Sequence, residues 1–262
     1  MRGSADQQLE GKTALVTGAS KGIGLAITQG LVDAGAFVVA AARSSSPEID
    51  ALAEAGSVRF VAADLGSADG PAALVSAAGD VDILVNNVGA ATTRVDGFLS
   101  VTDEQWLHSL TLNLLSAVRT TRAVLPGMLA AGHGTIVTVA SVNALLPDPA
   151  VIDYSASKAG LLNFMKSLSA EFGGRGIRVN CVSPGPVETD LWLGGGGVAD
   201  TVSKASGLAP EEVASAAVSG SATKRFTHPE EVADVVVFLA GDRAANLTGA
   251  NITLDGGLTQ GL

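Results

Sequence analysis

The sequence predicts an α/β fold, in which a doubly wound parallel sheet of about seven strands is covered by helices on both faces. Short apolar, β-branched runs alternate along the chain with Ala- and Leu-rich stretches of helical length. A glycine-rich turn joins the first such run to the first helix. The chain of 262 residues is 47% hydrophobic and 16% charged, which is a globular rather than a disordered composition.

Seven runs have the length and composition of strands that are buried on both faces. They span residues 14–16, 37–41, 59–62, 83–86, 135–140, 177–181 and 252–254. Apolar residues three and four positions apart predict helices near residues 23–34, 48–55, 71–78, 103–130, 154–172 and 229–240. Alternation of strand and helix requires right-handed crossovers and a parallel sheet, whose ligands sit at the carboxyl ends of its strands.

One domain is expected over residues 1–262, because no linker composition and no repeat interrupts the alternation. Residues 188–226 break the rhythm, and they include four consecutive glycines at 194–197. A long insertion beside strand ends predicts a lid over the substrate, with a surface loop as the alternative.

Composition and charge exclude several classes of protein. The net charge is −10 and no run of Lys or Arg tracks a phosphate backbone, so nucleic acid is not an expected partner. No apolar stretch approaches the roughly 20 residues that cross a bilayer, and the start MRGSADQQLEG lacks an apolar signal region. The single cysteine, Cys181, forms neither an internal disulfide nor a Cys-rich metal site. We expect a cytoplasmic protein without a metal or a membrane partner.

The turn TGASKGIG at residues 17–24 follows the first strand and opens the first helix. Its glycines let the backbone approach a phosphate, whose charge the first N–H groups of the helix receive. A tight turn without a ligand is the alternative. The strand before it and the helix after it favour pyrophosphate binding.

Tyr154 and Lys158 lie four residues apart at the start of a predicted helix, and Tyr154 is the only tyrosine of the chain. A free phenol titrates near pH 10, so acid-base work at neutral pH requires a neighbouring charge. Lowering the pKa of a phenol by about three units takes roughly 4 kcal/mol, which a fixed ammonium shielded from water supplies. By spacing alone, an exposed helical pair without a function is the favoured alternative. The other motifs around the pair favour a catalytic role instead.

Two further polar residues lie where such a site is expected. Ser141 ends the fifth strand, so its hydroxyl can face the crevice of Tyr154; a turn serine is the alternative. Asn113 lies inside an apolar helical pattern, where its amide needs a partner. A water site is expected there, and a solvent-facing amide is the alternative.

Polar or Gly/Pro breaks also follow three other strands: Asp64-Leu65, Asn86 to Gly89, and Pro184 to Val187. Each is an ordinary turn when taken singly. Together they line the edge of the sheet at which the glycine turn lies.

From about Lys12 to Gly257 these motifs resemble the short-chain dehydrogenase/reductase family, in the family's order. The resemblance implies a single-domain Rossmann fold and a catalytic tetrad of Asn113, Ser141, Tyr154 and Lys158. The cofactor site then comprises Gly18, Ser20, Lys21, Gly22, Ile23, Gly24, Arg43, Asp64, Leu65, Asn87, Gly89, Tyr154, Lys158, Pro184, Gly185, Val187 and Thr189.

The resemblance also implies roles for the tetrad. Ser141 hydrogen-bonds the substrate oxygen, and Tyr154 protonates it while hydride arrives from the pro-S face of the nicotinamide. Lys158 lowers the pKa of the tyrosine and holds the ribose hydroxyls, and Asn113 anchors a relay water. The expected activity is hydride transfer between NADP(H) and a carbonyl or secondary alcohol. A cofactor-binding sensor without turnover is the alternative of another class, although it has no need of Tyr154 with Lys158.

The substrate is not specified by any motif. The expected substrate residues are Ser141, Tyr154, Val142, Asn143, Leu191 and Trp192, which with Leu145 and Leu146 suggest a small, apolar substrate. Arg94 is a candidate to bind a substrate carboxylate. A 3-oxoacyl thioester of acyl-carrier protein or coenzyme A is the alternative substrate. Arg175 matches one basic docking position of such reductases, but Gly132 stands at the other.

Two more expectations concern the cofactor type and the assembly. Ala42 stands where NAD-preferring members carry an acid, Arg43 follows it, and Lys21 lies in the glycine turn, so NADP(H) is predicted. The resemblance also implies a homotetramer, built through the helices near 103–130 and 154–172 and through residues 251–262.

Overall fold

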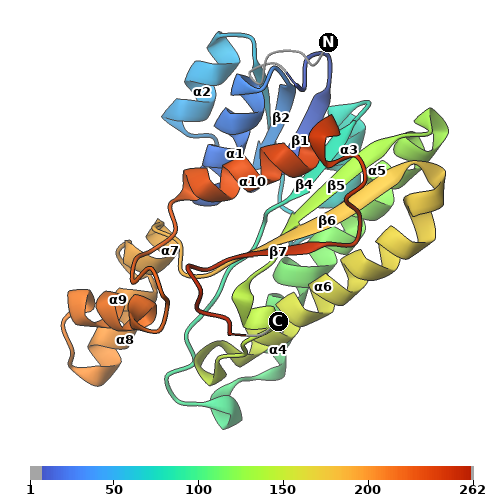
Figure 1. Ribbon diagram of the computed structural model, residues 1–262. Coiled ribbons are helices and arrows are strands. Elements are labelled where there is room, and N and C mark those ends of the chain that lie inside the picture. The colour runs from blue at the N-terminus through green and yellow to red at the C-terminus, as the bar shows by residue number, and fades with distance from the viewer. Residues whose placement is uncertain (1–7, 261–262) are drawn as a thin grey trace.

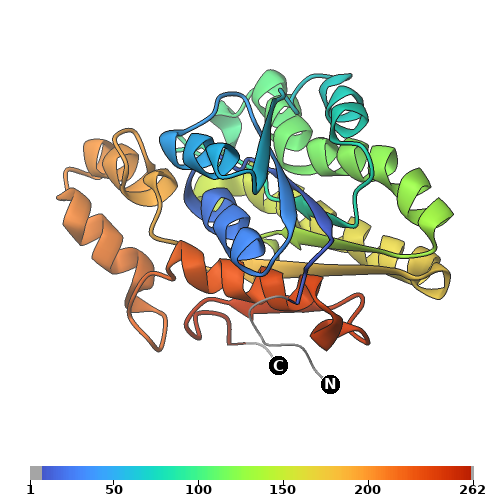
Figure 2. The same ribbon diagram turned by 90° about the horizontal axis from the view of Figure 1, so that it is seen from above.

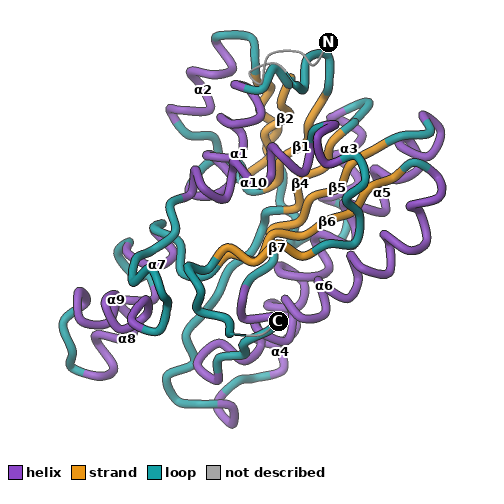
Figure 3. The backbone as a smooth tube through the Cα atoms, in the orientation of Figure 1, coloured by secondary structure: helices purple, strands orange, loops and turns teal. Residues whose placement is uncertain are grey.

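A single sheet of seven parallel strands forms the centre of the protein in the computed structural model, which describes residues 8–260 (Figures 1 and 3). The strand order is β3-β2-β1-β4-β5-β6-β7. The strands are β1 (Thr13–Thr17), β2 (Phe37–Ala42), β3 (Val58–Ala62), β4 (Ile83–Asn86), β5 (Gly134–Val139), β6 (Ile177–Pro184) and β7 (Asn251–Leu254). The chain reverses its winding between β1 and β4, and at such a switch point the strand ends leave a crevice for a ligand.

Helices cover both faces of the sheet (Figures 1 and 2). One face carries α1 (Gly22–Asp33), α2 (Pro47–Glu54) and α10 (Pro229–Ala240). The other carries α3 (Gly70–Ala78), α5 (Ser116–Ala131) and α6 (Ile152–Phe172), and α4 (Asp103–Leu110) packs against α6. This arrangement confirms the predicted single-domain, doubly wound α/β fold.

The two faces have separate apolar cores because successive side chains of a strand point to opposite sides. Val16 of β1 lies in one cluster with Ile27 of α1 and Val236 of α10. Its neighbour Leu15 lies in the other cluster, with Leu161 of α6. Each of these side chains is almost completely buried, and such burial stabilises the fold by roughly 1.5–3 kcal/mol per side chain. The sheet is therefore held rigidly between two layers, and its strand ends have fixed positions.

The predicted helix over residues 103–130 is divided in the structure. A π-helical segment, Thr111–Leu115, separates α4 from α5. Apolar periodicity does not distinguish a π-helical turn from an α-helical one, so the π-helical segment was not predicted. Such turns occur frequently at functional sites, and this one contains Asn113.

Residues 188–226 form three helices that the sequence did not predict: α7 (Asp190–Leu193), α8 (Val198–Ser206) and α9 (Pro210–Ser219). The glycines at 194–197 make the turn between α7 and α8, in which the N–H of Gly194 donates to Asp190 O. The helices α8 and α9 pack mainly against each other and stand away from the sheet (Figures 1 and 2).

A short β-bridge ties the two ends of this insertion together. Val187 pairs with Thr227, and the N–H of Glu188 donates to the carbonyl oxygen of Thr227 at 2.9 Å. The imidazole Nδ1 of His228 lies 3.1 Å from a carboxylate oxygen of Glu188. The two ends of the insertion are thus held next to each other.

No helix between residues 8 and 260 is both long enough and apolar enough to span a membrane. Two parts of the earlier expectations lie outside the described residues. They are the first seven residues of the amino-terminal segment, and residues 261 and 262 of the expected carboxyl-terminal interface.

Candidate active site

The glycine turn connects β1 to α1 at the centre of the sheet. Gly18 and Gly22 have φ angles of 67° and 53°, which glycine adopts without strain. A Cβ on Gly24 would overlap the carbonyl oxygen of Gly18, so only glycine fits there. No side chain caps the start of α1 at Lys21. The turn therefore presents helix N–H groups and open backbone, which suits a pyrophosphate.

Asn87 fastens the end of β4 to this turn. Its side-chain amide donates to the carbonyl oxygens of Thr17 at 2.9 Å and Gly18 at 3.2 Å, and its backbone N–H donates to Thr17 Oγ1. The residue expected to line the cofactor channel thus also holds the channel's two walls together.

The adenosine end of the expected cofactor site lies at the ends of β2 and β3. Arg43 and Lys21 are both exposed, and no carboxylate in residues 8–260 pairs with either of them. The side chain of Asp64 is exposed and accepts the N–H of Gly66, whereas Leu65 is buried in the core. Ser20 and Ile23, the other predicted residues of the glycine turn, are partly buried.

Asn113 links the π-helical segment to the segment after β4. Its Oδ1 accepts the N–H of Ala90 at 2.9 Å, and its Nδ2 donates to Ala90 O at 2.9 Å and to Ser109 O at 3.0 Å. The side chain is buried, so the alternative of a solvent-facing amide is wrong. Backbone groups use both amide hydrogens, and the side chain fixes the loop instead of offering a donor to a water. The relay water stays a prediction.

Gly89 permits the close approach of two tetrad side chains. A Cβ at this position would lie 3.0 Å from Asn113 Oδ1 and 3.2 Å from Lys158 Nζ. The crowding shows that Asn113 and Lys158 meet at the end of β4, beside the glycine turn. A side chain here would push one of them away.

Ser141 follows β5, and its hydroxyl interacts with Asn143. Ser141 Oγ accepts the N–H of Asn143 and donates to Asn143 Oδ1, both at 3.2 Å. The adjacent Val142 is buried and packs in the protein, so it offers less surface to a substrate than expected.

Lys158 carries a buried ammonium group. Its Nζ donates to the carbonyl oxygen of Val139 at 2.9 Å and lies 5.6 Å from the ring centroid of Tyr154. The residue is 2% exposed, and burial lowers the pKa of its ammonium to about 8. At neutral pH the group is therefore still mostly protonated.

The phenol of Tyr154 has a pKa above its ordinary value. Burial raises this pKa, and the contact with the Ser141 hydroxyl opposes the rise only in part. The net direction is therefore opposite to the lowering that the resemblance implies, and the contribution of Lys158 to this pKa stays a prediction. The physical reason is desolvation, because burial penalises the phenolate more than the surroundings stabilise it.

The nicotinamide end of the expected site follows β6. The N–H of Gly185 donates to Leu254 O at 2.9 Å, which holds the turn after Pro184 against β7. Val187 is buried at the β-bridge. Thr189 lies against the glycine turn, since its methyl would be 3.3 Å from a Cβ placed on Gly22. The two ends of the predicted cofactor site thus face each other across the strand ends.

The expected substrate wall is apolar and accessible. Leu145, Leu146 and Leu191 are between 42% and 50% exposed. The ring of Trp192 packs edge to face against Phe226, with 5.7 Å between the centroids. Arg94 is not available to a substrate carboxylate, because Asp153 holds its guanidinium in an ion pair. This pair was missed because nothing in the spacing of the two residues connects them.

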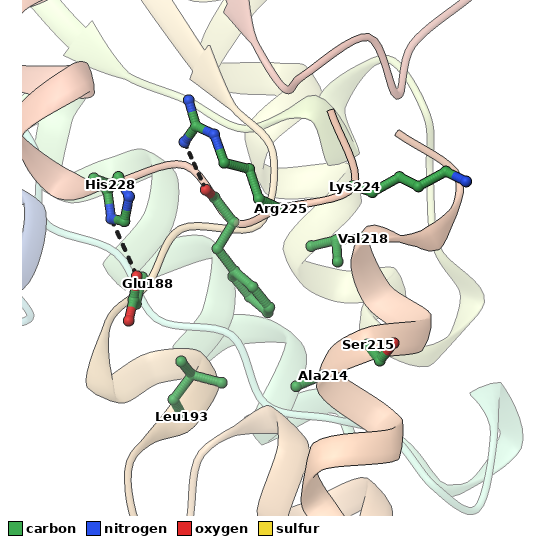
Figure 4. A pocket seen from close by; sticks show the side chains of 9 residues that line it. Glu188, Leu193, Ala214, Ser215, Val218, Lys224, Arg225 and His228 are labelled. Atoms are coloured by element: carbon green, nitrogen blue, oxygen red, sulfur yellow. Dashed lines mark hydrogen bonds and ion pairs between the residues drawn. The ribbon is translucent and has the colours of Figure 1, made fainter. Parts of the chain in front are cut away.

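A cavity of about 330 Å³ lies at the base of the insertion, and sequence reasoning did not anticipate it. Figure 4 shows its lining, to which α7, α9 and residues 224–228 contribute. The lining residues are Glu188, Leu193, Ala214, Ser215, Val218, Lys224, Arg225, Phe226 and His228. No group of three or more His, Cys, Asp or Glu side chains suited to a metal ion occurs in the described part of the chain.

The buried ammonium of Lys158 leads to a prediction about stability and pH. Its pKa is about 8 in the folded chain against an ordinary 10.5, so the unfolded chain binds more protons between these values. Stability should therefore rise with pH across this window. Lys158→Met removes the penalty of burying the charge and should stabilise the protein by at most about 3 kcal/mol near neutral pH.

Urea denaturation at about pH 7 and about pH 9.5 measures this effect, and the advantage of the variant should shrink at the higher pH. Lys166→Met, on the exposed side of the same helix, is the matched control and should show no such pH-dependent difference. An advantage of Lys158→Met that is equal at both pH values would contradict the burial of a charged ammonium.

The similarity of this chain to known proteins agrees with the family that its motifs indicate. The family model described as "Enoyl-(Acyl carrier protein) reductase" matches residues 18–259. The 3-oxoacyl-[acyl-carrier-protein] reductase FabG of Escherichia coli is 37% identical, over 95% of this chain and 98% of its own length. The D-threitol dehydrogenase of Mycolicibacterium smegmatis is 39% identical, over 97% of this chain and 95% of its own length.

A solved structure of L-sorbose reductase from Gluconobacter frateurii, complexed with NADPH and L-sorbose, superimposes with a TM-score of 0.90. The two chains are 34% identical, and the match covers 98% of this chain and 100% of the reductase. Together with the strand order, the glycine turn and the position of Tyr154 beside Lys158, these matches show that the chain is an oxidoreductase of the short-chain dehydrogenase/reductase family.

Proposed function

We propose that the protein is an NADP(H)-dependent carbonyl reductase or alcohol dehydrogenase acting on a small, apolar substrate. The observation that carries the proposal is the meeting of Tyr154, Lys158 and Ser141 at the strand ends beside an uncapped, glycine-rich helix start. These residues fit a nicotinamide dinucleotide. Such a cofactor supplies hydride exchange with a carbonyl carbon, and the protein supplies orientation and proton transfer.

The chain's own residues divide the remaining work. The hydroxyl of Ser141 orients the substrate oxygen, and Tyr154, protonated at neutral pH because its pKa is raised, donates a proton to that oxygen. The ammonium of Lys158 is fixed by Val139 O and keeps a positive charge beside the phenol as it loses its proton. Asn113 holds the loop at Ala90, and Gly89 leaves room for the Lys158 ammonium beside it.

Replacement of Tyr154 by Phe tests this assignment. Carbonyl reduction should fall by about a hundredfold or more, because the proton donor is lost, while binding of NADPH changes little. Turnover is measured by absorbance of the reduced cofactor on a panel of ketones, a ketose and a 3-oxoacyl thioester, and cofactor binding by fluorescence. Turnover by the variant within tenfold of the wild type would contradict the role of Tyr154.

The same panel tests a second candidate, reduction of a 3-oxoacyl thioester. The similarity to FabG favours it, but Gly132 stands where a carrier-binding reductase has a basic docking residue. The exposed leucines at the strand ends instead favour a compact apolar ketone, for which they offer contact area without a charged partner.

NADP(H) is the proposed cofactor because of two exposed cations and a missing acid. Arg43 follows Ala42 at the end of β2, and Lys21 lies in the glycine turn. A guanidinium can bind a 2′-phosphate through two hydrogen bonds, whereas an acid at position 42 would repel it. The L-sorbose reductase that resembles this chain was solved with NADPH, which supports the proposal.

Arg43→Ala should raise the Michaelis constant for NADPH by about one to two orders of magnitude, because a charge-assisted hydrogen bond contributes roughly 1.5–3 kcal/mol. The constant for NADH should barely change. Arg243→Ala, an exposed arginine after the carboxyl end of α10, is the control and should affect neither cofactor. Equal efficiency of the wild type with NADH and NADPH would show that the cofactor assignment is wrong.

Residues 188–226 are proposed to act as a lid over the cofactor and substrate. Both ends are pinned by the bridge between Val187 and Thr227, while α8 and α9 make few contacts with the sheet. A segment with this anchoring can rotate as a unit. Hydrogen exchange in α8 and α9 should slow when NADP and an alcohol are added, whereas exchange that is equally slow with and without ligands would contradict a lid.

The homotetramer and the cytoplasmic location stay predictions. Phe98, Leu99 and Leu107, beside the helices expected to meet a second copy, are between 58% and 96% exposed. Apolar side chains so exposed favour an interface. Light scattering at micromolar concentration tests the oligomeric state, and a monomer would exclude the tetramer.

A further inference from the structure

A buried ion pair lies immediately before the catalytic tyrosine. Arg94 comes from the segment between β4 and α4, and Asp153 is the second residue of α6. The guanidinium donates through Nε to Asp153 Oδ1 at 3.2 Å and through Nη2 to Oδ2 at 2.6 Å. The side chains are only 10% and 2% exposed. The backbone N–H of Arg94 also donates to Ala150 O at 2.7 Å, so the contact joins two segments of the chain.

Stability alone does not account for such a pair. Removing two charges from water costs several kcal/mol per ion, and apolar side chains of similar volume often stabilise a protein as well or better. Burial alone would raise the pKa of Asp153, but the Arg94 guanidinium, together with hydrogen bonds from the backbone and Ser109, keeps this pKa below its ordinary value. The carboxylate is therefore charged, and its two oxygens are held in one orientation.

Asp148 holds part of the start of α6, because its side chain caps the preceding 3₁₀ turn at Ala150 and its backbone meets Ser155 Oγ at 3.4 and 3.5 Å. No side chain caps the helix at Val151, so the first turn, which carries Tyr154, depends on other contacts. A carboxylate in the first turn interacts favourably with the helix dipole, and Arg94 anchors that carboxylate to the neighbouring segment. The ion pair thus adds an anchor, beyond the Asp148 cap, at the turn that bears the phenol.

The pair also reaches the other side of the tetrad. The carboxylate of Asp153 interacts with the hydroxyl of Ser109. The same hydroxyl accepts a long hydrogen bond, 3.4 Å, from Nδ2 of Asn113. Tyr154 and Asn113, which come from different helices, are therefore connected through one buried polar cluster formed by Arg94, Asp153 and Ser109.

We propose that Arg94 and Asp153 are positioning residues for the reaction: their ion pair fixes the first turn of α6 so that the Tyr154 phenol stays against Ser141. The inference rests on the proposed function, because it assigns the pair to that catalytic site. It concerns a contact that the spacing of the two residues in the sequence does not reveal.

Kinetics of three variants test the proposal. Asp153→Asn and Arg94→Met each leave one buried charge, and the double variant leaves none, so it is expected to fold even if a single variant does not. All three should lower kcat by about tenfold to a hundredfold while KM for NADPH stays within about twofold, because a misplaced proton donor slows the chemical step. Glu171→Gln, the same chemical change at the exposed far end of α6, is the control and should leave kcat unchanged.

The pKa of Tyr154, measured in each variant, distinguishes an effect of the phenol's position from an effect of the remaining charge. Because the chain has one tyrosine, the near-ultraviolet absorbance of phenolate reports Tyr154 alone. Asp153→Asn should lower the pKa of the phenol and Arg94→Met should raise it, since each leaves the opposite charge nearby. Loss of kcat in both single variants supports positioning. Activity that rises with one and falls with the other, or that stays within twofold of the wild type in the double variant, would overturn the proposal.

A last measurement needs no substrate, so it does not depend on the proposed function. Ser141→Ala should raise the pKa of Tyr154 in the otherwise unchanged chain, because the serine hydroxyl lowers that pKa. In the chain that also carries Arg94→Met and Asp153→Asn, the same substitution should have little effect if the phenol has left Ser141. An equal rise in both backgrounds, with circular dichroism showing an intact fold, would refute the positioning role. Failure of the wild type to reduce any carbonyl would refute only the proposed function.

Discussion

The buried ammonium of Lys158 constrains the geometry of the whole active site. A charge that is 2% exposed needs a strong acceptor, and the carbonyl oxygen of Val139 provides one because β5 ends there. This anchor places Lys158 on the sheet, and α6 in turn places Tyr154 one turn earlier. Gly89 favours the same arrangement, since a Cβ there would be crowded by the ammonium at 3.2 Å and by Asn113 Oδ1 at 3.0 Å. The end of β5, the helix α6 and the loop at Gly89 therefore meet at the Lys158 ammonium.

Periodicity was sufficient to predict the fold because the inner strands β1, β2, β4, β5 and β6 are almost entirely buried, whereas the edge strands β3 and β7 are partly exposed. The alternation of strands and helices then favours a parallel, doubly wound sheet. The prediction was incomplete where no apolar face is needed. The helices α8 and α9 are short and bury few side chains, so their apolar residues were not recognised as helical faces. The π-helical segment around Asn113 has the same apolar spacing as an α-helix.

The same reasoning explains which parts of the candidate site were found. The glycine turn and the Tyr154 to Lys158 spacing are local patterns, and their chemistry depends on residues close together in the sequence. Partners that are distant in sequence were not predictable. Asn113 bonds to the backbone of Ala90, and Arg94 bonds to Asp153, 59 positions away. The direction of the Tyr154 pKa was also missed, because it depends on burial, which spacing does not report.

These observations divide the molecule into a rigid part and an adaptable part. The groups that we propose to transfer a proton are held by buried hydrogen bonds and by strands packed on both faces, so their spacing is set before any substrate arrives. The apolar side chains that would contact the substrate, such as Leu145 and Leu191, are about half exposed and lie on loops or on the pinned insertion. Sequence changes in the insertion can then alter the apolar wall without disturbing the buried polar groups. Membership of the family therefore identifies the protein as an oxidoreductase, while the identity of the substrate depends on residues that no general motif constrains.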